Sequence, residues 1–187
     1  MNKPQLQHNI KSSVEEIIGS VLVTDIFLYG SRTYGTAKVS SDWDLIAICE
    51  DVKNGQQFEK HNLNITSYTA EHFQEKLDEG KPFAIECFIA LPQHKLFSNT
   101  KFKLDPKKVS TDAIYKKIEE DKQKLIRDDV SYDKKIKIKL YNIKLNRLIS
   151  YLEGHKISMC LKDEYLEILE GKEPEEVLKL NPYGKSE

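Results

Sequence analysis

Residues 28–48 read LYGSRTYGTAKVSSDWDLIAI, and they carry more structural information than any other part of this chain. An apolar run ends in a turn at Gly30 and Ser31, ten residues follow, and Asp42 and Asp44 then flank a tryptophan before a second apolar run. Side chains two apart in a strand share a face, so the two carboxylates project side by side. Such a pair attracts a hard cation such as Mg²⁺, and a Gly-Ser turn offers N–H groups and a hydroxyl to phosphate. The stretch therefore predicts phosphoryl or nucleotidyl transfer.

The composition bounds the class of protein. A chain of 187 residues holds one domain, or a small catalytic domain with a helical appendage. Hydrophobic residues make up 39% and charged residues 32%, as in soluble globular proteins. No apolar run is long enough to cross a bilayer, and the N-terminus lacks a signal-peptide core, so we expect no membrane partner. The three cysteines are isolated and odd in number, which predicts small buried hydrophobes and a reducing, cytoplasmic location.

The near-neutral net charge hides an uneven distribution. Residues 101–147 hold 15 Lys and Arg against 8 Asp and Glu, a net charge of +7, while the segments before and after each carry −4. A basic segment of this kind suits a partner that carries phosphates, and it is equally typical of a solvated helix surface. Both interpretations stay open at this point.

Hydrophobic periodicity and capping residues predict an α/β (α+β) fold. Residues 1–105 are expected to form a mixed β-sheet with flanking helices, and residues 106–187 a C-terminal helical region packed on it. The strands are expected over 21–29, 42–49 and 58–68. The helices are expected from Ser12 or Ser13 to Gly19, from Thr69 to Gly80, from Pro82 to Pro92, and over about 110–127, 133–153 and 161–169, with a further turn over 175–180.

The Gly30-Ser31 turn, the spacer of ten and Asp42-Trp43-Asp44 resemble the signature of the DNA polymerase β-type nucleotidyltransferase superfamily. The spacing looks most like that of its small stand-alone bacterial and phage members. Weaker similarity extends to Ile65–Tyr68 and Gly80–Glu86. The resemblance implies a nucleotidyltransferase-type sheet and a Mg²⁺-dependent enzyme, with Mn²⁺ as the alternative ion. Such an enzyme moves a nucleoside monophosphate from an NTP to an acceptor, here an RNA end, a protein hydroxyl or a small molecule.

The resemblance also implies roles for individual residues. Asp42 and Asp44 would hold the metal that bridges the triphosphate. We expect Trp43, between them, to lie in the core behind the sheet. Lys137 and its neighbours on the same predicted helix face would close over the triphosphate, although such lysines are common on amphipathic helices. Gly30 and Ser31 would meet the triphosphate, and Arg32 would either reach phosphate or acceptor or face solvent from a helix. Together with Lys144 and Arg147 of the later helix, these are the predicted nucleotide-binding residues.

One position departs from the superfamily pattern. The third carboxylate is usually supplied by the strand after the Asp pair, where this chain has Leu63-Asn64-Ile65. Asparagine offers a carbonyl ligand, but it cannot act as a base. Glu86 is our predicted substitute because it lies in a mostly apolar helix, and Glu59 is the second choice, so the predicted catalytic set is Asp42, Asp44 and Glu86. The alternative function is a catalytically weakened binding or regulatory module, such as a nucleotide sensor or an antitoxin-like partner.

Overall fold

The computed structural model describes residues 3–184, and their side chains from residue 10 onward. The chain has a mixed α/β fold, as predicted, and it divides into two compact units. Unit 1 comprises the described residues up to Thr33, Ala37–Asp78 and Phe83–Leu104. Unit 2 comprises the described residues from Asp105 onward together with two short segments, Tyr34–Thr36 and Glu79–Pro82, which the predicted boundary after residue 105 had assigned to the first domain.

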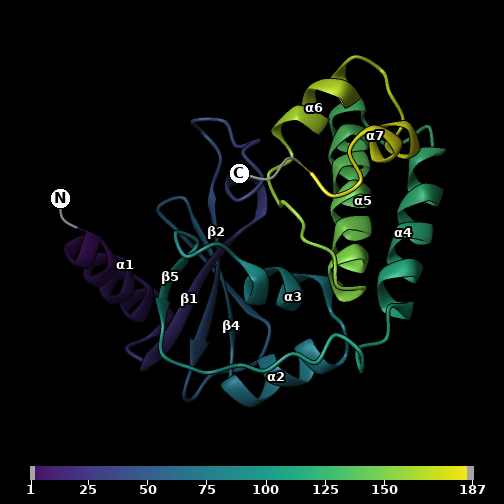
Figure 1. Cartoon of the computed structure of the whole chain (residues 1–187). Coiled ribbons are helices and arrows are strands. Elements are labelled where there is room, and N and C mark those ends of the chain that lie inside the picture. The colour runs from purple at the N-terminus through teal and green to yellow at the C-terminus, as the bar shows by residue number, and fades with distance from the viewer. Residues whose placement is uncertain (1–2, 185–187) are drawn as a thin grey trace. The chain divides into compact units, whose positions relative to one another are not determined.

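Unit 1 is built on a five-stranded sheet with the strand order β3-β4-β2-β1-β5 (Figure 1). The pair β2–β4 is parallel, and the other three pairs are antiparallel. The parallel pair brings the strand of the Asp pair beside the strand of Asn64. The strands are β1 (Val23–Tyr29), β2 (Trp43–Cys49), β3 (Gln56–Lys60), β4 (Leu63–Tyr68) and β5 (Lys95–Ser98).

The two faces of this sheet carry different apolar clusters, because successive side chains of a strand point to opposite faces. On one face, Ile26 and Leu28 of β1 belong to the same cluster as Val14 of α1 (Lys3–Ile18). On the other face, Phe27 stacks on Phe73 with ring centroids 5.7 Å apart. That second face is covered by α2 (Ala70–Asp78) and α3 (Pro82–Ile89).

The predicted third strand, residues 58–68, is wrong as a single element. It is a hairpin of β3 and β4, and the strands are separated by His61 and Asn62. Both turn residues have positive φ, 51° and 64°, the conformation that a two-residue hairpin turn requires. Glycine usually marks such a turn, and its absence here concealed the break. Similarly, α1 begins at Lys3, well before the predicted caps Ser12 and Ser13.

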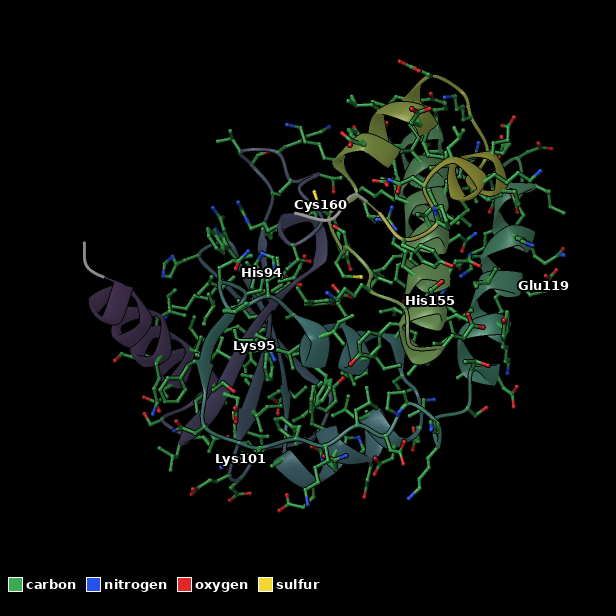
Figure 2. All side chains as sticks on the ribbon, viewed as in Figure 1. His94, Lys95, Lys101, Glu119, His155 and Cys160 are labelled. Atoms are coloured by element: carbon green, nitrogen blue, oxygen red, sulfur yellow. The ribbon has the colours of Figure 1, made fainter. Side chains whose placement is uncertain are left out.

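The edge strand β5 is attached to unit 1 through side chains as well as through its ladder. The carboxylate of Asp25, fully buried in β1, accepts hydrogen bonds from the backbone N–H groups of Asn99 at 2.9 Å and Thr100 at 3.0 Å. Lys95, labelled in Figure 2, donates from Nζ to the carbonyl oxygen of Phe88 at 2.8 Å. These bonds fix both ends of the short strand.

Unit 2 is helical apart from its connecting segments. The predicted apolar stripe on its longest helix is confirmed, since Leu145, Leu148 and Leu152 are buried and Tyr141 is half-buried. Among the described helices of the whole chain, none is long and apolar enough to cross a membrane. Cys49 and Cys87 are buried as predicted, whereas Cys160 is half-buried. The helices of unit 2 are α4 (Asp112–Leu125), α5 (Tyr132–Leu152), α6 (Lys162–Leu169) and α7 (Pro174–Leu180).

Candidate functional site

Four polar side chains form a row across four neighbouring strands of unit 1. Asp44 of β2 is in register with Tyr29 of β1 on one side and with Asn64 of β4 on the other. Asn64 is in turn in register with Glu59 of β3. Directly opposed residues of adjacent strands project from the same face, so all four side chains lie on the face that α2 and α3 cover. This row is the foundation of the candidate site.

The turn that follows β1 lies against Asp44. Gly30 has φ +79°, and a Cβ added to it would collide with Oδ2 of Asp44 and lie 3.2 Å from its Cγ. Only glycine combines this conformation with so close an approach. Residues Gly30–Arg32 form a single 3₁₀ turn, closed by Thr33, whose N–H and Oγ1 both donate to the carbonyl oxygen of Gly30 at 3.0 and 2.8 Å. Ser31, in the middle of this turn, is half-buried.

The electrostatics of the row centre on Asp44. Burial raises the pKa of its carboxyl group, and the nearby charges of Asp42 and Glu86 raise the pKa further. A hydrogen bond from Asn64 and the charge of Arg32 act in the opposite direction. Burial, followed by the carboxylates of Asp44 and Glu86, also raises the pKa of Tyr29 to about 12, so its hydroxyl stays protonated at neutral pH. The site concentrates negative charge, and a cation would relieve it.

Asn64 occupies the position that the sequence pattern gave to the third acid. Its Nδ2 donates to Oδ1 of Asp44 over 3.4 Å. Both residues line a hollow of about 120 Å³, which Glu59 also lines. Among the described residues, no group of three His, Cys, Asp or Glu side chains is arranged to hold a metal ion. A divalent ion would therefore depend on Asp42, Asp44 and the amide oxygen of Asn64, and these hard oxygen donors suit Mg²⁺.

Glu86 interacts electrostatically with two residues of this row. Its side chain, on α3, is 3% exposed, and its charge raises the pKa values of both Asp44 and Tyr29. Thr33 Oγ1, in the turn after β1, donates to Glu86 Oε1 over 3.4 Å. The sequence pattern had identified neither Tyr29 nor Thr33. Their positions, immediately before Gly30 and two residues after Ser31, were the only available signal.

Arg32 and Trp43 form a stacked pair beside the row. The prediction that Trp43 lies in the core is wrong, because its side chain is 40% exposed. It is the first residue of β2, and the Cζ atom of Arg32 lies 4.2 Å from its ring centroid. The guanidinium also donates to the carbonyl oxygens of Ser41 and Asp42, the latter at 3.1 Å. Arg32 thus fastens the loop that carries Asp42.

The two basic residues predicted from the helical region, Lys144 and Arg147, are both buried in α5. Lys144 is 2% exposed; its Nζ donates to the hydroxyl of Tyr34 at 2.6 Å and lies 4.2 Å from the ring centroid of Tyr141. Lys137, by contrast, is exposed.

Arg147 is fully buried and has protein partners. Its guanidinium is ion-paired with Glu164 and donates to the carbonyl oxygens of Ser158 and Cys160, each at 3.0 Å (Cys160 is labelled in Figure 2). These partners favour a structural role for Arg147 in unit 2 over contact with a nucleotide, so Arg147 is not part of the candidate site.

Comparison with known proteins shows no family for this chain. No protein-family model matches the chain, and no curated protein is significantly similar to it.

Proposed function

We propose that unit 1 is a Mg²⁺-dependent nucleotidyltransferase of the DNA polymerase β type, which moves a nucleoside monophosphate from an NTP to a hydroxyl acceptor. The observation that carries the proposal is the contact between the Gly30 turn and Asp44. This contact places a turn of the phosphate-binding kind beside the Asp44 carboxylate, whose pKa is raised by burial and by like charges. In a turn with only a structural role, a partly buried carboxylate packed against the glycine would be unfavourable.

Each residue of the site has a distinct task in this proposal. Asp42 and Asp44 supply carboxylate ligands, and Asn64 supplies an amide oxygen. When bound, Mg²⁺ neutralises charge on the triphosphate and so favours attack at the α-phosphorus. The N–H groups of Gly30 and Ser31 donate hydrogen bonds to phosphate oxygens, while Arg32 holds the loop of Asp42 in place.

The base that deprotonates the acceptor hydroxyl is proposed to be Glu86, with Glu59 as the alternative. Glu86 interacts electrostatically with Asp44, and Glu59 lies next to Asn64 in the sheet and lines the same hollow. A positioned base contributes roughly 10²–10⁴-fold to such a reaction. Replacement of the true base by glutamine would therefore lower kcat by about that factor, and the same change at the other glutamate would have little effect.

A second candidate function is supported by Asn64 alone. With an amide in place of the third acid, the same site would bind Mg²⁺ and NTP without turning them over, as a nucleotide sensor or the regulatory partner of another protein. The Asp42 and Asp44 pair argues for the enzyme, because two adjacent carboxylates are unfavourable unless a metal is bound. We also propose a cytoplasmic location, where NTP and Mg²⁺ are abundant.

The test is incubation with each α-labelled NTP, Mg²⁺ or Mn²⁺, and a cell extract that presents RNA, protein and small-molecule acceptors together. Label transfer that disappears in Asp44→Ala and persists in Asp51→Ala, an exposed acid just beyond β2, supports the enzyme. Metal-dependent NTP binding without transfer would select the second candidate. Absence of both binding and transfer would overturn both functions.

A further inference from the structure

The hollow beside Asp44 extends over strands β3 and β4 of unit 1. Its volume is about 120 Å³, whereas pockets that enclose a whole drug-sized ligand take roughly 300–1,000 Å³. In the proposed reaction the triphosphate lies against the Gly30 turn, so the hollow is left for the second substrate, which brings a hydroxyl group to the α-phosphorus. The hollow therefore holds the part of the acceptor that carries this hydroxyl. The residues whose side chains line it are Tyr29, Asp44, Gln57, Glu59, Asn64 and Thr66.

Every side chain that faces the hollow is polar. Phe58 and Ile65 also border it, but their side chains belong to the apolar cluster on the other face of the sheet. A nucleobase or another aromatic ring needs an apolar surface on which to stack, and the hollow offers none. The side chains on the same face as Asp44 form two directly opposed pairs between β3 and β4, namely Gln57 with Thr66, and Glu59 with Asn64.

The polar groups of β3 and β4 are accessible to a ligand. Gln57 and Glu59 are exposed, and Thr66 is half-buried. The side chains of these three residues form no hydrogen bond or ion pair with any residue that the structure describes. An amide, a carboxylate and a hydroxyl together donate and accept hydrogen bonds, as a ligand with several hydroxyl groups requires.

No cationic side chain lines the hollow. None of its lining residues is Lys, Arg or His, whereas Asp44 and Glu59 are acidic. Lys60, the next residue along β3, points to the opposite face, where its Nζ lies 3.1 Å from Oε1 of Glu16. The phosphodiester backbone of RNA binds through Lys and Arg side chains, so an RNA end would meet like charge here without a compensating cation.

On the basis of the proposed transferase function, we propose that the acceptor is a carbohydrate without anionic groups, whose hydroxyl-bearing ring occupies this hollow. One hydroxyl oxygen of the ring forms a bond to the α-phosphorus of the NTP. The bond from that phosphorus to the oxygen shared with the β-phosphorus breaks, and pyrophosphate leaves with its electron pair. The hydroxyl proton passes to the base, Glu86 or Glu59. Gln57 and Thr66 form hydrogen bonds with neighbouring hydroxyl groups and so orient the ring.

The experiment divides a cell extract into four acceptor fractions: RNA, protein, small molecules that an anion-exchange resin retains, and small molecules that it does not retain. Each fraction is incubated with the full-length chain, Mg²⁺ and each α-labelled NTP. We expect label transfer to the unretained small molecules at least about tenfold above that to any other fraction. Oxidation of this fraction with periodate, which cleaves the bond between adjacent hydroxyl-bearing carbons, should abolish the transfer.

The outcomes separate this inference from the transferase function. Transfer to RNA, to protein or to anionic small molecules, or to an acceptor that resists periodate, would overturn the carbohydrate acceptor and leave the transferase intact. No transfer to any fraction would refute the transferase, and the carbohydrate acceptor with it.

Two neighbouring glutamines of β3 provide a matched pair of variants. Gln57 faces the hollow, whereas Gln56, which is also exposed, points to the opposite face and does not line it. Gln57→Leu removes a neutral hydrogen bond to the acceptor, so we expect the KM for the acceptor fraction to rise about three- to tenfold while the KM for NTP stays unchanged. Gln56→Leu should change neither value. A rise in the KM for NTP alone, or equal effects of the two variants, would show that the acceptor does not bind in this hollow.

Discussion

Asn64 changes the character of the candidate site through a single amide. A carboxylate at this position would face Asp44 across adjacent parallel strands, whereas the amide donates a hydrogen bond to it. That bond partly offsets the burial and the like charges that raise the pKa of Asp44. The amide therefore spares the row a third negative charge, and in the proposed function it would be a weaker metal ligand than a carboxylate.

Asn64→Asp should place a third carboxylate in the row and make the free energy of unfolding depend on Mg²⁺. Without Mg²⁺ the variant loses a donor to Asp44 and gains a like charge beside it, so we expect a loss of about 1–3 kcal/mol in the free energy of unfolding. Saturating Mg²⁺ should recover most of this loss, because a ligand that binds only the native state stabilises it. The measurement is urea unfolding with and without Mg²⁺. A variant whose stability does not respond to Mg²⁺ would show that Asn64 does not lie at a metal site.

Asp44→Asn should show how the raised pKa of Asp44 acts on stability. Because the folded pKa lies above the unfolded one, the native state binds the proton more tightly, and stability falls as pH rises from about 4 through the folded pKa. The variant lacks this loss. The difference in the free energy of unfolding, variant minus parent chain, should therefore be more positive at about pH 7 than at about pH 4. Urea unfolding of both proteins at both pH values measures this difference. A constant difference between the two proteins across pH would contradict the stated cause.

Gly30→Ala separates close approach from backbone strain. Both Gly30 and Gly55 have positive φ, 79° and 74°, but a Cβ at Gly55 meets nothing within 4 Å. The left-handed conformation costs each alanine variant about 1–2 kcal/mol. The collision with Asp44 should cost Gly30→Ala a further 1–3 kcal/mol, roughly, and should abolish label transfer. Similar unfolding free energies for the two variants would mean that the turn moves freely away from Asp44.

At the scale of elements, the sequence predicted those that carry a strong local signal. Strands β1 and β2 are predicted to within two residues, because one apolar run ends at the Gly30 turn and the next begins at the Asp pair. The hairpin between β3 and β4 was missed because His61 and Asn62 adopt positive φ without glycine. The exposure of Trp43 was missed as well, because its ring packs against the guanidinium of Arg32, which belongs to another element. Contacts made by tertiary structure leave no periodic pattern in the chain.

The buried ion pair between α5 and α6 provides the test of Arg147 at this scale. Arg147→Met leaves Glu164, 3% exposed, without its cation, so we expect a loss of about 3–5 kcal/mol in the free energy of unfolding. The double variant Arg147→Met with Glu164→Leu should recover most of that loss. Lys137→Met removes an exposed charge from the same helix and should change stability by no more than about 0.5 kcal/mol. If Arg147→Met instead keeps its stability and loses only NTP affinity, Arg147 belongs to the nucleotide site after all.

At the scale of the whole molecule, the two units present different chemistry. Unit 1 carries the acidic row and the glycine turn, while unit 2 carries the cavity between α4, α5 and α7 and the buried ion pair of Arg147 with Glu164. The proposed transferase reaction uses residues of unit 1 alone. The basic segment 101–147 belongs mostly to unit 2, and two of its cations, Lys144 and Arg147, are buried there.

Hydrogen exchange with a minimal ligand should therefore give a footprint confined to unit 1. Mg²⁺ with inorganic tripolyphosphate, which has no base, should slow exchange over residues 28–33 and 43–46. At a ligand concentration of about 100 times Kd, openings that release the ligand become about 100-fold rarer, and protection rises by that factor. Protection confined to unit 2, or no protection at all, would refute the proposed transferase site. Such a result is decisive, because a transferase that does not hold a metal-bound triphosphate has no means of activating its substrate.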